Sequence, residues 1–511
     1  MKPRQYGELR TRSGCWKCRE RRVKCPEQRP ICGHCKRLGF VCAYDVRLSW
    51  QAVVTPKTGP RGRKPEPAVE DWMFLNTTIS DFINADPPSQ HIHARPTQYA
   101  GDIRGHGHLT SHIGPYLPPL SMDREDSYLW EYFATCVTPH CSLDKGTNPY
   151  QNVILRIAAS SPQGPLFQCI IGASANQLYN LGHKSFGAKS WQCRANALAL
   201  LTKGVTDQAY QADTDSQRLD PDSAAQLIGS AVMLCFSEIL QDCSQTWTAH
   251  ASFALSYLQK YEPELENIAP VLHELAQFAV AYFTYHVALA STASTTAASQ
   301  RPLPLTRAIS SSGTCPMTTL QLLTGCSDRL LDLISDITQL STEKERLYPA
   351  PVPDFKRRRD NIERELYALH QPVASPPGSE QTQFNDIAEL KRLTTLLYLH
   401  SRVDNAGPRE PHVMRLTARI LQSLQHISLR TNTILWSLFI VATLGVRPES
   451  DGDRKLVMER LTALQRTREL GNVRMARRII EDVWRARDLD PSCATLAWSI
   501  LKDRNGAISL A

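Results

Sequence analysis

Six cysteines lie within the first 42 residues of this 511-residue chain, and their spacing repeats. Two pairs separated by two residues are each followed by a single cysteine after six more residues, which gives Cys15, Cys18, Cys25, Cys32, Cys35 and Cys42. A pair with this spacing can chelate one tetrahedral zinc from a single turn. Two four-coordinate zinc ions need eight ligands, so six sulfurs are enough only if two of them bind both ions. The repeat indicates that these two are the first cysteines of each half, Cys15 and Cys32. We therefore expect two Zn(II) ions, with folding of this segment coupled to the metal.

Other uses of these cysteines fit less well. A disulfide framework is typical of extracellular proteins with a signal peptide, whereas residues 1–14 are polar and basic with no apolar stretch. A single structural zinc or an eight-ligand module needs a different ligand count, and His34 is the only histidine in the segment.

A run of cations overlaps the first half of the repeat. Residues 17–24 contain five cations and one acidic residue, Glu20. The cations are Lys17, Arg19, Arg21, Arg22 and Lys24. Arginine and lysine donate to O6 and N7 of guanine in the major groove, and further cations contact phosphates. The pattern predicts a short basic helix that binds double-stranded DNA and ends before Pro26. Alternatively, the cations only balance the net negative charge of the cluster, and both effects can operate together.

The segment Cys15-Trp-Lys-Cys-Arg-Glu-Arg-Arg-Val-Lys-Cys25, followed by Pro30-Ile-Cys-Gly-His-Cys35, resembles the DNA-binding domain of the fungal binuclear zinc-cluster transcription factors. The resemblance implies that Arg21 and Arg22 read bases, that Arg19 and Lys24 contact phosphate or the cluster, and that the site is a G/C-rich triplet of the C-G-G type. The resemblance does not predict the spacing between the two DNA triplets that a dimer would bind. No sustained heptad follows between Tyr44 and Glu66, which favours a monomeric or loosely paired reader, although a homodimer stays open.

Charge is divided unequally along the chain. Residues 1–65 carry 17 Lys and Arg against four Asp and Glu, whereas residues 66–511 carry 41 against 46. A basic head attracts DNA without sequence preference. Within it, Arg61, Arg63 and Lys64 lie among glycines and prolines at 57–67, which is typical of a nuclear-import signal or linker. The alternative is a minor-groove arm similar to an AT-hook, although Lys64 interrupts the expected order.

We expect three parts: the zinc cluster at 10–47, a basic and then Pro/His-rich linker at 48–122, and a large domain at 123–511. Within the linker, Trp72, Leu75, Ile79 and Phe82 fall at helical spacing among acidic residues. This predicts an amphipathic helix over 66–86. It either docks on the large domain or activates transcription by folding on a coactivator.

Repeated amphipathic segments predict that the large domain is all-α. We expect helices at 128–137, 166–181, 224–240, 247–261, 271–289, 318–340, 387–400, 413–429, 454–469 and 473–487. The apolar run 434–446 is too short to span a bilayer, so we expect a buried helix and no membrane partner. The motifs Ile434-Leu-Trp436-Ser-Leu-Phe439, Gly471-Asn472 and Glu481-Asp-Val-Trp484 resemble the fungus-specific regulatory domain that accompanies these zinc clusters.

Catalytic motifs are missing from the sequence. His273-Glu274-Leu-Ala-Gln277 begins like a zinc-protease helix but has glutamine where the second histidine belongs. We expect no enzyme activity. The cysteines outside the cluster are scattered, and only the close pair Cys136 and Cys141 leaves a redox-sensing role open.

The expected function is a nuclear, zinc-dependent, sequence-specific RNA polymerase II transcription factor that regulates a metabolic gene cluster, as the resemblance implies. Its helical domain would contact the transcription machinery or coactivators and respond to a small-molecule effector. The alternative is a DNA-bound repressor or interaction scaffold with no ligand response.

Overall fold

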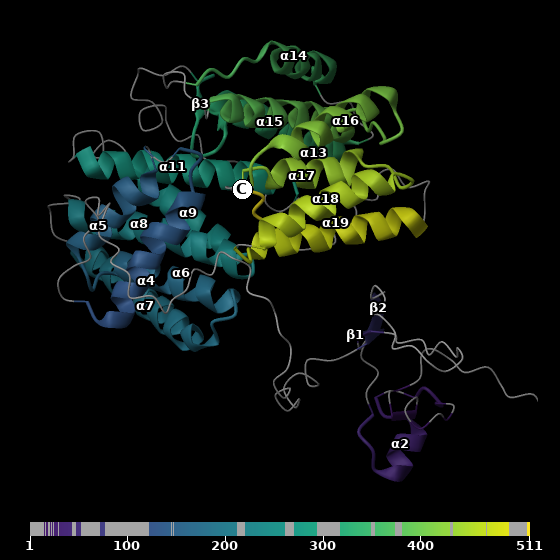
Figure 1. Cartoon of the computed structure of the whole chain (residues 1–511), viewed down its shortest axis with the longest axis horizontal. Helices are drawn as coiled ribbons and strands as arrows, with labels where there is room; N and C mark the ends of the chain where they lie inside the picture. The colour runs from purple at the N-terminus through teal and green to yellow at the C-terminus, as the bar shows by residue number, and fades with distance from the viewer. Residues whose placement is uncertain are drawn as a thin grey trace, which may run out of the picture. The chain divides into compact units, whose positions relative to one another are not determined.

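The structure is a computed structural model that divides into two compact units, residues 1–109 and 110–511 (Figure 1). It describes residues 15, 17–18, 21, 23, 25–28, 30–42, the backbone of 48–52 and 72–76, and then 122–144, 146, 148–211, 220–260, 270–293, 317–348, 353–373, 381–429, 433–466, 468–489 and 508–511.

The first unit contains a turn of helix, a second short helix and a two-stranded ribbon. Helix α2 (Gly33–Leu38) begins where the sulfur of Cys32 accepts a hydrogen bond from the N–H of Cys35, and it ends at Gly39 with φ 67°. Only glycine adopts this left-handed conformation without strain. The N–H groups of Arg21 and Val23 donate to the carbonyls of Lys17 and Cys18, which closes the first helical turn.

The helix expected over 66–86 is wrong at its centre. Strand β2 (Trp72–Asn76) pairs antiparallel with β1 (Leu48–Ala52), and Trp50 lies opposite Phe74. A short run of large apolar residues satisfies helical spacing and strand preference equally well, and aromatic residues favour strands when a partner is available. The rest of 66–86, the linker histidines and the basic segment 57–67 lie outside the described residues.

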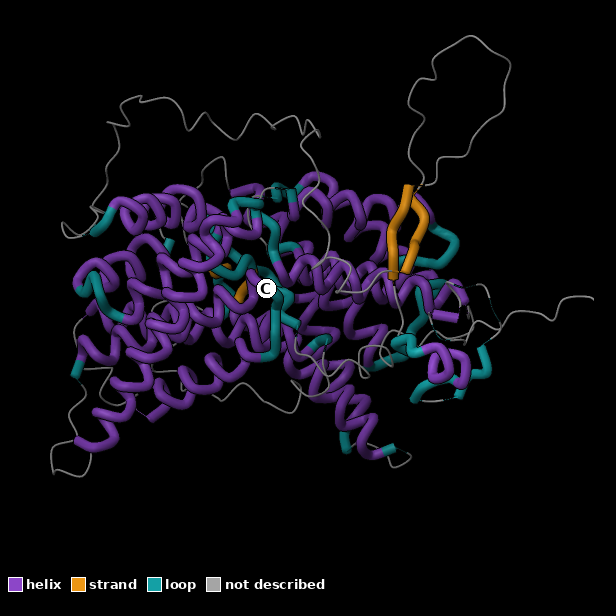
Figure 2. Tube along the Cα trace, turned by 90° about the horizontal axis from the view of Figure 1, so that it is seen from below, coloured by secondary structure: helices purple, strands orange, loops and turns teal. Residues whose placement is uncertain are grey.

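The second unit is built almost entirely of helices (Figure 2). Its α-helices are α4 (Arg124–Tyr132), α5 (Leu155–Ser160), α6 (Pro165–Asn180), α7 (Gly187–Gln211), α8 (Pro221–Gln241), α9 (Thr246–Lys260), α11 (Pro270–Ser291), α13 (Asp328–Leu347), α14 (Phe355–Ala368), α15 (Gln381–Arg402), α16 (Pro411–His426), α17 (Leu435–Ile440), α18 (Asp451–Gln465) and α19 (Gly471–Leu489). Shorter 3₁₀ and π-helical turns are η1 (Phe133–Val137), η2 (Thr138–His140), η3 (Tyr150–Ile154), η4 (Lys184–Phe186) and η6 (Val441–Gly445).

Local sequence signals set several helix starts. The carboxylate of Asp123 accepts from the N–H of Asp126 at the start of α4, and that of Asp220 accepts from the N–H of Ser223 at the start of α8. Both side chains satisfy N–H groups that have no partner within the helix. Proline stands in the first turn of α6, α8 and α16, where its missing N–H costs nothing.

The expected helix at 318–340 begins later, at Asp328. The hydroxyl of Ser327 accepts from the N–H of Leu330 and caps α13. Before it, Gly325 has φ 69°, and the chain forms a small hairpin of β3 (Leu320–Gln321) and β4 (Cys326–Ser327). The left-handed glycine and the cap together stop the helix from extending toward its N-terminus. Helices α5, α7 and α14 were not predicted.

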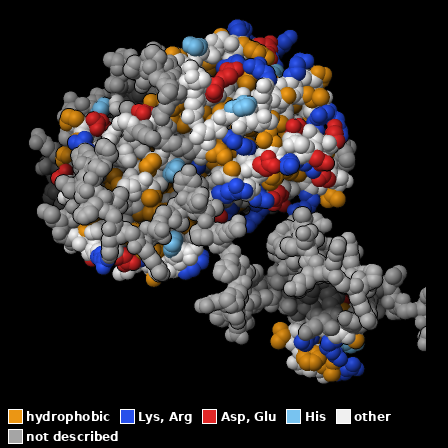
Figure 3. All heavy atoms as spheres, viewed as in Figure 1, with side chains coloured by type: hydrophobic (Ala, Val, Ile, Leu, Met, Phe, Trp, Pro, Cys, Tyr) orange, Lys and Arg blue, Asp and Glu red, His pale blue; other side chains and the backbone are white. Residues whose placement is uncertain are grey.

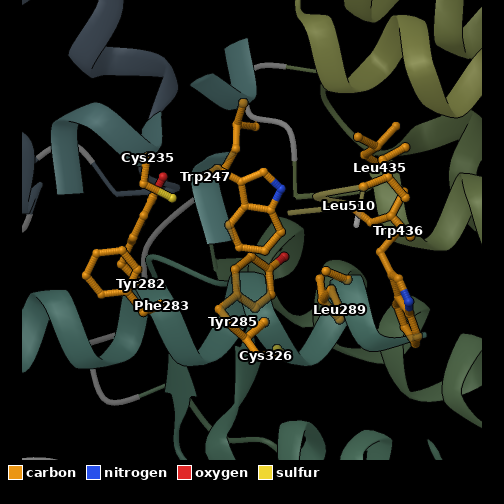
Figure 4. Packing of buried hydrophobic residues seen from close by; sticks show 14 of the residues in the cluster. Cys235, Trp247, Tyr282, Phe283, Tyr285, Leu289, Cys326, Leu435, Trp436 and Leu510 are labelled. Carbon is orange, nitrogen blue, oxygen red and sulfur yellow. The ribbon is translucent and has the colours of Figure 1, made fainter. Parts of the chain in front are cut away.

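Helix α11 runs through the core of this unit. It packs against α8, α9 and α13. Figure 4 shows α11 carrying Tyr282, Tyr285 and Leu289 into the buried cluster. There the indole N–H of Trp436 donates to the hydroxyl of Thr292 across 3.0 Å. Residues 508–510 are also buried, so the last described segment contributes to the same core.

Two helical segments of this unit are strongly apolar. The run 435–445 forms α17 and η6, and every side chain in it is buried, which confirms the expected buried helix. By length and composition α8 is apolar enough to cross a membrane, but 78% of its most apolar window is buried inside the protein, as in the core helix of a globular domain.

Candidate zinc centre and DNA interface

Four of the six cysteine sulfurs form a compact group, those of Cys15, Cys18, Cys32 and Cys35, which all lie within 4.8 Å of one another. The sulfurs of Cys15 and Cys32 are 3.6 Å apart. Each of these two also approaches the other half of the repeat, since Cys15 is 3.6 Å from Cys35 and Cys32 is 3.7 Å from Cys18. The two halves therefore meet through their first cysteines.

These separations fit zinc. Two sulfurs bound at about 2.3 Å to one tetrahedral zinc lie about 3.8 Å apart. Cys25 is buried with this group, and Cys42 packs against it half-buried. The donor set is therefore made only of soft sulfur ligands, which suit zinc. Two zinc ions are the cofactor of this centre.

Backbone N–H groups point at the sulfurs. The N–H of Cys15 donates to Cys25 Sγ at 3.4 Å, and that of Cys32 donates to Cys42 Sγ at 3.2 Å. The N–H of Glu27 also donates to Cys25 Sγ, at 3.4 Å. Hydrogen bonds of this kind stabilise the thiolate form that zinc requires and fix the orientation of the ligands. The two bonds Cys15 to Cys25 and Cys32 to Cys42 are equivalent by the internal repeat.

Ionisation of the sulfurs depends on the metal. Burial raises the pKa of the Cys18 thiol to about 12 and raises that of Cys15 as well. Burial opposes ionisation of Cys32 too, but the N–H of Cys35 and the neighbouring thiols lower the pKa of Cys32 below its ordinary value. Zinc must therefore displace protons from the first pair when it binds.

Phe40 organises two of the predicted DNA-binding cations. The ammonium of Lys17 lies 5.5 Å from the centre of the Phe40 ring, and the guanidinium carbon of Arg21 lies 5.3 Å from it. Phe40 comes from the second half of the repeat, so it fixes cations of the first helical turn across the cluster. Phe40 was not predicted from the sequence, although an aromatic residue two positions before the last cysteine is a visible signal.

The described surface of this unit mixes cations with apolar side chains (Figure 3). Arg21 is exposed, as are Lys36 and Arg37 on α2. Arg19, Arg22 and Lys24 lie outside the described residues, and so do Arg61, Arg63 and Lys64. The structure therefore places two of the five predicted DNA-binding residues.

The protease-like motif on α11 does not form a metal centre. His273 and Gln277 hydrogen-bond each other on α11 at 3.0 Å. Within the described ranges, the cysteine group is the only set of side chains spaced to hold a metal. The Cys141 thiol donates to the carbonyl of Val137, and burial raises its pKa to about 12, which makes it a poor redox sensor.

Comparison with known proteins agrees with this centre. Residues 13–51 match the fungal Zn(2)-Cys(6) binuclear cluster domain, and residues 127–511 match the fungal specific transcription factor domain. No solved structure matches the chain.

The curated relatives match mainly through the N-terminal region. A Zn(2)-C6 fungal-type transcription factor, afumD of Aspergillus fumigatus, is 45% identical over 90 residues, which are 16% of this chain and 24% of that protein. The thiamine biosynthesis regulatory protein of Saccharomyces cerevisiae is 51% identical over 41 residues, or 8% of this chain and 9% of the relative. Arginine metabolism regulation protein II of the same yeast is 41% identical over 49 residues, or 9% and 6%.

The alignments thus span at most about a quarter of each of these relatives. The second domain match, in contrast, covers most of the present chain. With a zinc-cluster DNA-binding domain at one end and this helical domain over the remainder, the chain belongs to the fungal Zn(2)-Cys(6) transcription factors.

Proposed function

We propose that the chain is a nuclear regulator of RNA polymerase II transcription that binds DNA sequence-specifically and only with zinc. The observation that carries the proposal is the sulfur group in which Cys15 and Cys32 each contact both halves of the repeat. The adjacent cationic turn folds only when these sulfurs bind metal.

The sulfur distances support a specific ligand assignment. One zinc takes Cys15, Cys18, Cys25 and Cys32, and the other takes Cys32, Cys35, Cys42 and Cys15. Cys15 and Cys32 are assigned as the bridging ligands. Each of their sulfurs lies 3.6–3.7 Å from both sulfurs of the opposite pair, whereas Cys18 and Cys35 each have one such neighbour. The remaining four cysteines each bind one metal.

The DNA contacts follow from the cationic turn. Lys17 and Arg21 flank Phe40, and Arg19, Arg22 and Lys24 occupy neighbouring positions of the sequence. We assign base reading to Arg21 and Arg22 at a C-G-G type triplet and phosphate contacts to the others. Arg61, Arg63 and Lys64 serve nuclear import.

The helical domain at 123–511 regulates rather than catalyses. Its assigned partners are coactivators or the transcription machinery, and the protein controls a metabolic pathway. The names of two relatives, which refer to thiamine biosynthesis and arginine metabolism, support a pathway role.

The test is selection of bound DNA from a random pool by the full chain, with zinc and with chelator. Enrichment of G/C triplets that disappears with chelator and relaxes in Arg22→Ala supports the proposal. Arg37→Ala is the matched control, because Arg37 is an exposed cation of the second helix, and it should keep the same selected sequence. Enrichment that is unchanged by chelator would overturn zinc-dependent reading.

A further inference from the structure

A cavity of about 110 Å³ lies inside the helical unit, where α8 and α11 meet the turn between α18 and α19. Phe236, Ile239 and Leu240 of α8 form an apolar wall. His140 and Cys141, which are half-buried, line it as well.

One cation faces this cavity. Arg468 lines it, although its side chain is only 6% exposed. Its Nη2 donates to the carbonyl of Leu429 at 3.1 Å, but its Nε has no hydrogen-bond partner. Among the residues that the structure describes, no carboxylate side chain forms an ion pair with this guanidinium, and neither Asp nor Glu lines the cavity, although Ala511, the last residue of the sequence, does.

Burial lowers the pKa of Arg468 to about 10, so it remains charged at neutral pH. A buried charge without a counterion is costly, because desolvation is not compensated. An anion in the cavity would supply that compensation, and a planar carboxylate matches the fork of guanidinium donors.

A second polar group lines the cavity. The side chain of Gln177 on α6 is buried and lines the cavity, and its Oε1 has no hydrogen-bond partner. The main-chain oxygen of Ala511, another lining group, already accepts from Asn472 at 3.2 Å. Gln177 is therefore available to a hydroxyl or amine of a ligand, whichever way its amide is turned.

We propose that this cavity binds a small organic carboxylate that carries a second polar group, with the carboxylate on Arg468, the polar group on Gln177 and the carbon chain against α8. A cavity of about 150 Å³ holds benzene, so the present volume suits a molecule of about four to six non-hydrogen atoms. The site is remote from the zinc centre in sequence and gives the helical domain a ligand of defined chemistry.

Lactate and its neutral isostere lactamide are matched probes. Binding to the full zinc-loaded chain is measured by ligand-observed saturation-transfer NMR and by thermal unfolding, without DNA and at constant ionic strength. Lactate should bind and raise the unfolding temperature, and lactamide should bind at least about tenfold more weakly.

Arg468→Gln should weaken lactate binding by at least about tenfold. Arg487→Gln is the matched control, because Arg487 is also buried (4% exposed) with unpartnered nitrogens and does not line the cavity. It should bind lactate as the natural chain does. Equal binding of lactate and lactamide, no binding of either, or equal loss in both variants would overturn the proposal.

Loss of folding in Arg468→Gln would leave a test on the natural chain. Lactate should then slow backbone hydrogen exchange at 429 and 468–473 beyond the effect of lactamide, and the absence of that difference would reject the site. Since DNA is not used, these results are independent of whether the zinc cluster reads a G/C triplet.

Discussion

The ammonium group of Lys391 donates a hydrogen bond to the hydroxyl of Tyr285 across 2.5 Å and so joins α15 to α11 inside the helical core. It also donates to the carbonyl of Thr324. Lys391 is 1% exposed, and no carboxylate forms an ion pair with it in the described part of the chain. Burial lowers its pKa from 10.5 to about 8.

This lysine predicts a rise of stability with pH. Between pH 8 and pH 10.5 the unfolded chain holds a proton that folded Lys391 has released, so the free energy of unfolding increases as pH rises. Relative to Lys391→Met, the natural chain should gain about 2 kcal/mol between pH 7.5 and pH 10. Urea unfolding at the two pH values measures the difference.

Lys455→Met is the control for this effect, because Lys455 is a surface residue with 77% of its side chain exposed. It should follow the natural chain at both pH values. A parallel pH profile for Lys391→Met and the natural chain would show that Lys391 is not a buried charge.

Bridging by Cys32 predicts unequal effects of two cysteine substitutions. In the proposed ligand assignment Cys32 binds both metals and Cys42 binds one. Cys32→Ser should therefore lose both zinc ions, whereas Cys42→Ser should keep at least one. Native mass spectrometry counts the metals per chain. Cys136→Ser, at an exposed cysteine of the helical unit, should keep two. Two zinc ions retained in Cys32→Ser would refute the bridge.

The contacts of the Phe40 ring with Lys17 and Arg21 predict that DNA affinity depends on this ring, although Phe40 lies outside the basic turn. Phe40→Ala should weaken binding by about two- to fivefold, since each exposed cation–π contact contributes about 0.5–1 kcal/mol. Zinc content should not change, because Phe40 is not a ligand. Fluorescence anisotropy at fixed salt measures the affinity.

The neighbouring variant Val41→Ala serves as control for the loss of apolar surface, since Val41 is 89% exposed. An affinity of Phe40→Ala equal to that of Val41→Ala would mean that the ring does not position Lys17 and Arg21.

Two glycines predict opposite responses to alanine. At Gly471, the first residue of α19, a Cβ would overlap the backbone carbonyl of Gln241 at the end of α8. Gly471→Ala should therefore lower the free energy of unfolding by about 1–3 kcal/mol. Gly452 in α18 has nothing near its Cβ position, so Gly452→Ala should be neutral or stabilising by up to about 1 kcal/mol. Chemical denaturation compares them, and equal effects would contradict the close approach of α19 to α8.

Local signals in the sequence predicted what depends on near neighbours. The spacing of Cys15, Cys18 and their repeat indicated the metal, because chelation by a pair requires only a turn of chain. The apolar run 434–446 gave a buried helix, which the structure confirms. Where a short segment chooses between structures, the partner decides: Trp72–Asn76 is a strand because β1 pairs with it.

By itself, the sequence determined that this protein carries a two-zinc cluster with an adjacent cationic turn and a large helical domain. Only the tertiary structure decided that Phe40 holds Lys17 and Arg21, that Lys391 reaches Tyr285, and that Arg468 faces an apolar cavity. The physical reason is the distance along the chain over which each interaction acts. Metal spacing and helix periodicity act over a few residues, whereas a cavity or a buried cation is created by packing between segments that are distant in the chain.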